Sequence, residues 1–344
     1  MVNPFSKFSG VQTIKADLSM LEENYIPEEF PHRERQIESM VTVLSSIVRN
    51  SRPSNIIIYG KTGTGKTSTV KYVTRMLTEA TSEVKVLYVN CEIYDSPYSI
   101  LVFISNELQG EKVPELGWPL DRIYREIVDR LNASGKFLVL VLDEMDRLIK
   151  KSGGDSLYVL LKLISDIDGV KASLIGITND TTLLENIDSR IKSRMNQESI
   201  IFPPYNAPEI KDIITSRLEK VLDFRIVDET AINLSAAIGA QEHGDARKAL
   251  ELMRISIEIA IRNGRDKVSE REVYEAREKY EMNVLREAIN TLPLQSKIVL
   301  LSAIVTQEIE PNTTITGEIY ENYRSICSEL GFSPLTPRRI SDLL

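Results

Sequence analysis

Residues 55–67 read NIIIYGKTGTGKT, and this stretch indicates the fold of the chain's first part. Asn55–Tyr59 is a short β-branched run typical of a buried strand, and Gly60–Thr67 matches the pattern G-x-x-x-x-G-K-[ST]. In such a loop the glycines let the backbone curl so that N–H groups face phosphate oxygens, and the following helix contributes its positive N-terminus. We therefore expect Lys66 to reach the β- and γ-phosphates of a nucleotide and the Thr67 hydroxyl to hold Mg²⁺.

Further apolar runs predict the rest of a sheet. They lie at Val84–Val89, Phe137–Leu142, Ser173–Thr178 and Ser199–Phe202. A helical pattern at 34–49 precedes the first strand, and others lie between the strands at 66–79, 120–131 and 156–167. Apolar strands that alternate with helices predict an α/β fold with a parallel sheet covered on both faces.

The strand signal stops after Pro203-Pro204. Helical patterns follow at 208–221, 228–240, 244–263 and 269–281, and a third segment starts near Met282 with helices at 284–290, 294–306, 316–330 and 336–344. We therefore expect three domains, at residues 1–203, 204–281 and 282–344.

Composition limits the classes of protein that fit. The chain of 344 residues is 42% hydrophobic and 27% charged, which is ordinary globular composition. Its fullest apolar runs, Phe137–Leu142 and Ile298–Val305, fall far short of the ~20 residues of a membrane span, and no secretory leader is recognisable. Two cysteines and two histidines exclude a disulfide framework, a Cys-based zinc site and a histidine cluster. We expect a soluble, intracellular protein of several domains without membrane partners.

Polar residues at two strand ends extend the phosphate site. The strand Phe137–Leu142 ends in Asp143 and Glu144, and the carboxyl ends of parallel strands adjoin the crevice where ligands bind. Asp143 would orient Mg²⁺ and Glu144 would polarise an attacking water; the alternative is a pair of solvated acids at a helix start. Asn179 follows Ser173–Thr178 and would hold the γ-phosphate or that water, unless it belongs to a simple Asn-Asp turn.

Arginines complete this pattern. Arg190 and Arg194 lie one helical turn apart, and Arg247 follows Asp245 in the first turn of a predicted helix. An arginine that meets the transferring phosphate neutralises the charge that develops there. The alternative for each is a surface arginine on an amphipathic helix.

Together these motifs resemble those of the AAA+ ATPases, in which a phosphate-loop domain carries a helical lid. Within that group the chain resembles the archaeal origin-recognition replication initiators. Tyr25–Glu34 resembles their N-terminal adenine-side segment, Leu142–Asp146 their Walker B sequence, Asn179 their sensor 1 and Gly244–Arg247 their sensor 2. The resemblance spans nearly the whole chain.

The resemblance implies ATP or ADP and Mg²⁺ as ligands. The nucleotide-binding positions it implies are Tyr25, Ile26, Pro27, His32, Arg33, Gly60, Lys61, Thr62, Gly63, Thr64, Gly65, Lys66, Thr67, Ser68, Tyr205, Arg217 and Arg247, with Thr67 and Asp143 at the metal. The implied catalytic residues are Glu144, Asn179, Arg247 and an arginine finger that acts on a neighbouring subunit, Arg190 or alternatively Arg194.

The C-terminal segment resembles the winged helix of these initiators. The chain stops at Leu344, before a β-hairpin wing, so we expect an incomplete domain with Thr336 and Pro337 starting its recognition helix. Basic residues number five against seven acidic ones from 284 to 344, so charge alone does not nominate a DNA-binding face. The resemblance nominates Arg338 and Arg339, and Arg122 in an extra helical segment; the alternative is a winged helix that binds protein.

The resemblance implies an ATP-dependent initiator that binds origin double-stranded DNA and helps load the replicative helicase, with slow hydrolysis as a switch. Another initiator subunit or paralogue is the implied partner. A signalling ATPase and a clamp-loader subunit are the alternatives. Arg247 argues against a signalling ATPase, because such proteins generally lack an arginine at the sensor 2 position. The short C-terminal helices argue against a clamp-loader subunit, which would be expected to end in a helical collar domain.

Overall fold

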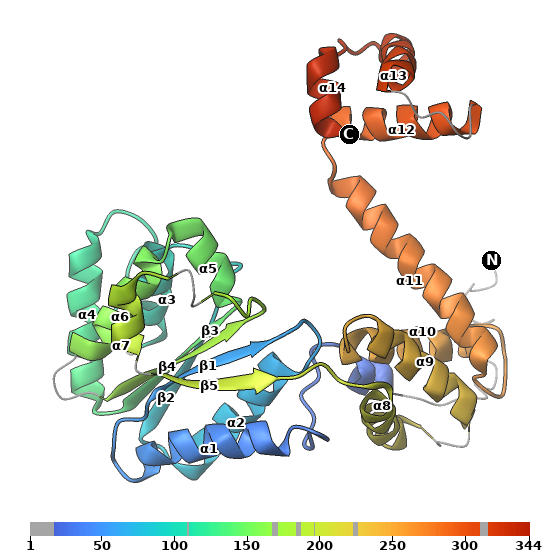
Figure 1. Cartoon of the computed structure of the whole chain (residues 1–344). Helices are drawn as coiled ribbons and strands as arrows, with labels where there is room; N and C mark the ends of the chain where they lie inside the picture. Colours follow the sequence, from blue (N-terminus) through green and yellow to red (C-terminus); the bar gives the residue numbers. More distant parts are fainter. Residues whose placement is uncertain are drawn as a thin grey trace, which may run out of the picture. The chain divides into compact units, whose positions relative to one another are not determined.

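A computed structural model of the chain describes residues 17–108, 110–166, 171–183, 187–195, 197–222, 226–309 and 316–344. The chain divides into two compact units, Met1–Ala276 and Arg277–Leu344 (Figure 1). No helix among these described residues is long and apolar enough to span a membrane.

The first unit contains a five-stranded parallel sheet in the order β2-β3-β4-β1-β5 (Figure 1). Its strands are β1 Asn55–Gly60, β2 Val84–Asn90, β3 Phe137–Asp143, β4 Ala172–Thr178 and β5 Gln197–Phe202. The predicted parallel α/β sheet is confirmed, and each predicted strand lies within two residues of its observed bounds. Three central strands are buried along nearly their whole length, which explains why their sequences are continuously apolar.

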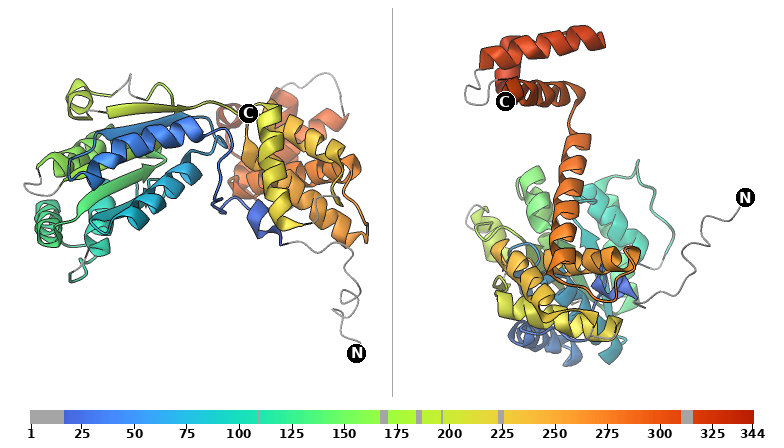
Figure 2. Two further views of the ribbon diagram at one scale, coloured as in Figure 1. Left: turned by 90° about the horizontal axis from the view of Figure 1, so that it is seen from below. Right: turned by 90° about the vertical axis from the view of Figure 1, so that its right-hand side faces the viewer.

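Helices cover both faces of the sheet (Figure 1 and Figure 2). One face carries α1 Glu34–Val48 and α2 Lys66–Ala80, whose buried residues include Met40, Leu44 and Val73. The other face carries α3 Pro97–Glu107, α4 Leu120–Ser134, α5 Met145–Ser152, α6 Asp155–Asp166 and α7 Ser189–Met195. The sequence patterns did not predict α3 or α5, and they indicated α7 only through the one-turn spacing of Arg190 and Arg194. Two of these have only seven or eight residues, too few to show a helical period.

The rest of the first unit is helical. Helices α8 Ala207–Val221, α9 Glu229–Gln241 and α10 Ala246–Arg262 pack on one another, and the short 3₁₀ helix η2 Leu18–Leu21 contacts α8 and α10. The start of α8 is fixed by a reciprocal capping box, in which the Asn206 and Glu209 side chains each accept the other's backbone N–H. Asp245 caps α10 by accepting N–H groups of Arg247 and Lys248.

Helix α11 corrects one prediction. The separate helices expected at 269–281 and 284–290 form a single helix, Glu270–Thr291. Residues 279–286 contain neither glycine nor proline, so nothing in the backbone interrupts the helix there. The boundary between the two compact units falls inside this helix.

The second unit is small. Helices α12 Leu294–Ile309, α13 Thr316–Leu330 and α14 Pro337–Leu343 surround a core of Ile298, Val299, Tyr323, Cys327 and Ile340. Thr336 stands at the N-cap and Pro337 at the first helical position of α14, as predicted. Within residues 277–309 and 316–344 the structure shows no strand.

Candidate nucleotide site

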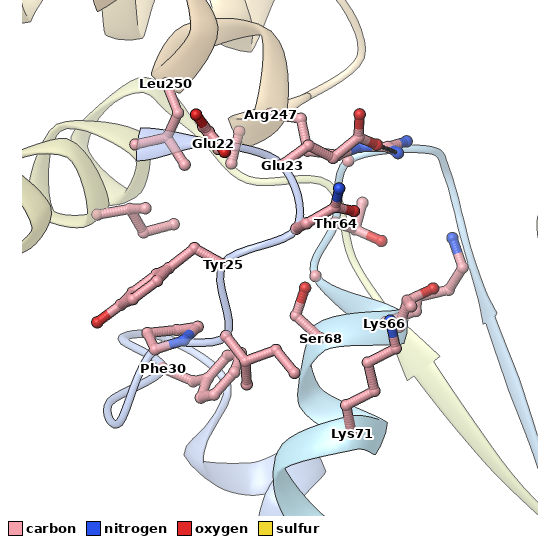
Figure 3. A pocket seen from close by; sticks show the side chains of 18 of the residues that line it. Glu22, Glu23, Tyr25, Phe30, Thr64, Lys66, Ser68, Lys71, Arg247 and Leu250 are labelled. Carbon is pink, nitrogen blue, oxygen red and sulfur yellow. Dashed lines mark hydrogen bonds and ion pairs between the residues drawn. The ribbon is translucent and has the colours of Figure 1, made fainter. Parts of the chain in front are cut away.

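A pocket of about 340 Å³ opens in the first unit beside the glycine-rich loop (Figure 3). Its walls come from four parts of the chain: residues 22–31, the loop and start of α2, the ends of β2, β3 and β4, and the helices α8 and α10. Figure 3 shows Tyr25 and Phe30 on one side of the cavity and Lys66 and Ser68 on the other. Segments far apart in sequence therefore meet around one space that is partly apolar and partly charged.

The loop has the backbone that its sequence predicts. Gly63 and Gly65 have φ values of 74° and 86°, in the left-handed region that favours glycine. A Cβ at Gly63 would come 2.8 Å from the Cα of Asp245, so the loop also passes too close to the start of α10 for a side chain. The loop leads directly into the 15-residue helix α2. A glycine cradle that ends on a helix N-terminus fits the phosphates of a nucleotide.

Lys66 is buried at the base of this loop. Its ammonium donates to the carbonyls of Gly60 at 2.9 Å and Lys61 at 2.8 Å, and to Asn179 Oδ1 at 2.7 Å. Burial, and next the positive charge of Arg247, lowers the pKa of Lys66 to about 8. The group is thus held by neutral acceptors in a setting where a phosphate would stabilise its charge.

Thr67 and Asp143, the two residues predicted to hold a metal ion, lie close together in the structure. The Thr67 hydroxyl lies 3.0 and 3.2 Å from the two carboxylate oxygens of Asp143. Among the described residues there is no group of three or more His, Cys, Asp or Glu side chains that could hold a metal by itself. One hydroxyl and one carboxylate fit Mg²⁺, which keeps several waters and is bound through few protein ligands together with substrate phosphates.

The structure adds a residue that the sequence patterns did not indicate at this site. The Tyr88 hydroxyl donates to Asp143 Oδ2 at 2.6 Å. The tyrosine lies on β2, which is paired with β3 along its whole length. A pattern of alternating faces along β2 could have placed Tyr88 on the side of α2, but not at this carboxylate.

Glu144 and Asn179 also meet. Asn179 Nδ2 donates to Glu144 Oε1 at 3.2 Å, so this amide joins Lys66 on one side to Glu144 on the other. Glu144 itself has a left-handed backbone, φ 56°, at the turn from β3 into α5. The buried Asp146 carboxylate lies 3.3 Å from the Thr178 hydroxyl and 3.5 Å from the Asn179 N–H, which orients the end of β4.

The helical part of the unit contributes two arginines to the pocket. Arg217 of α8 donates to the carbonyl of Met20 at 2.6 Å, and its guanidinium lies 4.6 Å from the centre of the Tyr25 ring. Arg247 of α10 forms an ion pair with Glu23. Both arginines therefore hold residues of the N-terminal segment against the pocket.

Part of the pocket lining is apolar. Its side chains include those of Tyr25, Ile26, Pro27, Phe30, Ile213 and Leu250.

Two expected nucleotide contacts lie elsewhere. Arg33 is buried outside the pocket lining, with its guanidinium 3.7 Å from the centre of the Tyr205 ring and hydrogen-bonded to three backbone carbonyls. His32 also lies outside the lining, and its Nε2 is 2.9 Å from Asp212 Oδ2 on α8. Both side chains bridge elements of the protein instead of facing the cavity.

The first residues of the loop are also absent from the lining. Gly60, Lys61 and Thr62 precede the part of the loop that faces the cavity, which begins at Gly63. The carbonyls of Gly60 and Lys61 are turned to the Lys66 ammonium. The other predicted positions, Thr64, Gly65, Ser68 and Tyr205, do line the pocket.

The two candidate arginine fingers lie outside the pocket of their own chain. Arg190 is exposed and pairs with Asp188, with Nη2 2.8 Å from Oδ2. Arg194 lies over the Tyr158 ring at 5.3 Å and donates to Ser165 Oγ at 3.2 Å.

The predicted DNA-contacting arginines are exposed. Arg122, near the start of α4, stacks its guanidinium 3.6 Å from the Trp118 ring centre. Arg338 and Arg339 occupy the first turn of α14 in the second unit. All three side chains are open to solvent, where a phosphate backbone can be reached.

The glycine-rich loop, the acidic end of β3 and the helical lid together define the class of this protein. It contains a phosphate-loop ATPase domain of the AAA type. Three family models match the chain in agreement with this class. They describe an AAA domain over residues 48–184, a Cdc6 AAA+ ATPase-type lid domain over 211–278, and a CDC6 C-terminal winged helix domain over 287–344.

Relatives cover the whole chain. An ORC1-type DNA replication protein of Thermoplasma volcanium is 79% identical over 344 residues, 100% of this chain and 85% of that protein. One from Picrophilus torridus is 52% identical over 347 aligned residues, 100% of this chain and 84% of that protein. A solved structure of the Aeropyrum pernix ORC1 protein in complex with DNA matches with a TM-score of 0.85 and 37% identity, over 97% of this chain and 87% of that one. The chain belongs to the ORC1-type DNA replication proteins, the Orc1/Cdc6 initiators among the AAA+ ATPases, and the predicted resemblance is confirmed.

Proposed function

We propose that the chain is an ATP-dependent initiator that binds origin duplex DNA and helps load the replicative helicase. The observation that carries the proposal is the likeness to a DNA-bound ORC1 protein over nearly the entire chain. A phosphate loop, an acidic strand end and a lid around one pocket supply the nucleotide half of the proposal.

In this proposal different residues bind the phosphates, the base and the metal ion of the nucleotide. Thr64, Gly65 and Lys66 bind the phosphates, and Tyr25 and Phe30 line the apolar part of the pocket for the base. Thr67 and Asp143 hold Mg²⁺, which when bound neutralises charge on the phosphate oxygens. Lys66 exchanges its carbonyl and amide acceptors for phosphate oxygens.

Hydrolysis is assigned to Glu144 and Asn179, with an arginine from a second subunit. Glu144 accepts the proton of the attacking water, and Asn179 orients both Glu144 and Lys66. Both candidate fingers lie outside the pocket of their own chain, and we assign Arg190, with Arg194 as the alternative, to the pocket of a neighbouring initiator subunit or paralogue. A single chain would then hydrolyse ATP slowly and reach its full rate only when assembled.

The nucleotide acts as a switch because the loop and the lid touch each other directly. The Ala246 N–H at the start of α10 donates to the Gly63 carbonyl at 3.2 Å, and Arg247 follows on the same helix. A γ-phosphate that binds both Lys66 and Arg247 favours one arrangement of lid and loop over others. ATP and ADP would thereby favour different DNA-binding states.

The test is duplex binding at constant salt. We would compare labelled origin-derived and scrambled duplexes by fluorescence anisotropy, with ATP, with ADP and without nucleotide, since phosphate contacts make affinity depend on salt. We expect tighter binding to the origin duplex and a different affinity in ATP than in ADP. The Lys66→Ala variant should lose the nucleotide effect, and equal binding to both duplexes in all states would contradict the proposal.

A further inference from the structure

The end of β3 is held in a rigid frame by its neighbour β2. The two strands pair in parallel, with Tyr88 opposite Val141 and Asn90 opposite Asp143. Just beyond the strand, the Cys91 N–H donates to the Asp143 carbonyl at 2.9 Å. The backbone of Asp143 is therefore fixed, and only its side-chain torsions remain to be set.

Hydrogen bonds set the orientation of that side chain. The Tyr88 hydroxyl donates to Asp143 Oδ2 at 2.6 Å, and the Glu144 N–H donates to Oδ1 at 3.1 Å. The Thr67 hydroxyl carries one proton and lies within hydrogen-bond distance of both oxygens. A short O–H···O⁻ bond belongs to the strong, charge-assisted class, so Tyr88 supplies the firmest side-chain contact.

The tyrosine ring is itself held in place. It packs against the apolar cluster under α2, and the Lys71 ammonium lies 5.2 Å from the ring centre.

We infer that Tyr88 is a positioning residue for magnesium: its hydroxyl holds the Asp143 carboxylate in the orientation that, with Thr67, binds the ion. The inference rests on the proposed nucleotide function and adds a residue to it. Groups that hydrogen-bond a metal's carboxylate ligand typically change metal affinity or activity by 10–100-fold when they are removed.

The test is a magnesium titration of the Tyr88→Phe variant. Nucleotide-free protein is titrated with a fluorescent ATP analogue, first in EDTA and then at rising Mg²⁺ concentration. We expect nucleotide affinity in EDTA to stay within about twofold of the parent, while the Mg²⁺ concentration at half effect rises roughly tenfold. A role in packing alone would leave that Mg²⁺ midpoint unchanged, because phenylalanine keeps the ring.

Controls separate the possible outcomes. Tyr94→Phe removes the hydroxyl of a partly buried tyrosine whose ring packs on Phe103 against the apolar cluster on the opposite face of the sheet, and it should titrate like the parent. Asp143→Asn should lose the Mg²⁺ effect. An unchanged or lower midpoint in Tyr88→Phe, or an equal loss of affinity in EDTA, overturns the inference. A parent whose nucleotide binding does not respond to Mg²⁺ overturns the metal part of the proposed function as well.

Discussion

At the scale of single residues, Glu144 offers the sharpest test of the hydrolytic assignment. Its carboxylate accepts a hydrogen bond from Asn179 Nδ2, and glutamine at this position keeps an oxygen for that bond while losing the basic group. Glu144→Gln should therefore bind ATP like the parent and lose turnover by at least about 100-fold, the usual contribution of a general base. Single-turnover phosphate release measures this loss, and persistent turnover would remove Glu144 from the role of base.

Glu23 is a second residue with a measurable effect, because it pairs with the arginine assigned to the γ-phosphate. Both Glu23 and Arg247 line the pocket, and their ion pair is partly exposed. Glu23→Gln frees Arg247 for phosphate, so the preference for ATP over ADP should rise by up to about fivefold, the range of an exposed ion pair. Competition titrations with the two nucleotides measure the preference. Glu22→Gln, at the neighbouring lining position, is the matched control, and an equal change in both variants would count against the pair.

The ion pair between Arg190 and Asp188 leads to a prediction about the titration of the Asp188 carboxyl group. Its hydrogen bonds to the Asp188 carboxylate lower the pKa of Asp188 to about 2, from an ordinary value of 3.8. Because the folded-state pKa is the lower one, the stabilisation by this pair is complete above about pH 4 and disappears as the pH falls through about 2. Arg190→Ala should return the Asp188 titration toward its ordinary value, measured from the carboxyl ¹³C shift. Lys192→Ala should leave it near 2; an unmoved midpoint in Arg190→Ala would contradict the assignment.

At the scale of elements, Arg33 links its own segment, just before α1, to the phosphate loop and to the connection between β5 and α8. Its guanidinium donates to the carbonyls of Thr64 in the phosphate loop at 3.0 Å and of Pro203 after β5 at 2.7 Å, and it stacks on Tyr205 before α8. Arg33→Ala leaves these buried carbonyls without a donor and should lower the free energy of unfolding by about 3 kcal/mol.

Urea denaturation of Arg33→Ala and of Arg35→Ala measures this difference. Arg35 is exposed in the first turn of α1, two residues after Arg33, so its removal should change stability by less than about 0.5 kcal/mol. Equal stability of the two variants would show that the guanidinium is not what ties the loop to the lid connection.

The same scale shows how far the sequence could predict the molecule. Strands were predictable because buried parallel strands are continuous apolar runs, and Lys66, Asp143 and Asn179 were predictable because each stands at a strand end or in a local motif. Helix α3 begins with a Ser96–Ser99 capping box that does not contain the usual acid, so its start carried little signal.

What could not be predicted depends on contacts between distant segments. Tyr88 meets Asp143 only because β2 pairs with β3 in one particular register. Arg33 lies one residue before α1 among motif residues, yet its burial depends on Pro203 and Tyr205, about 170 residues away. The resemblance to the initiators implied a nucleotide contact for Arg33. In the structure its side chain instead connects the phosphate loop to the segment between β5 and α8.

At the scale of the whole molecule, DNA binding must overcome an overall negative charge. The net charge is −8, so the proposed DNA binding requires local basic groups, and we assign it to Arg122 in the first unit and to Arg338 and Arg339 in the second. Removing Arg122 and removing Arg338 or Arg339 should therefore reduce DNA binding in different ways. An arginine at the start of a recognition helix reads base edges, whereas Arg122, stacked on the partly buried Trp118 in the first unit, is assigned to the phosphate backbone.

The two effects can be separated by measuring the affinity for origin and scrambled duplexes at several salt concentrations. Arg122→Ala should weaken binding to origin and scrambled duplexes equally and reduce the salt slope by about one. Arg338→Ala and Arg339→Ala should each weaken origin binding more than scrambled binding, by about 1–3 kcal/mol where a base contact is lost. Arg324→Ala removes one exposed charge from the same unit, paired with Glu321, and serves as the control.

If all four variants lose affinity alike for both duplexes, charge alone accounts for binding and α14 does not read sequence. If only the α14 variants narrow the preference for the origin, specificity resides in the second unit and Arg122 contributes affinity.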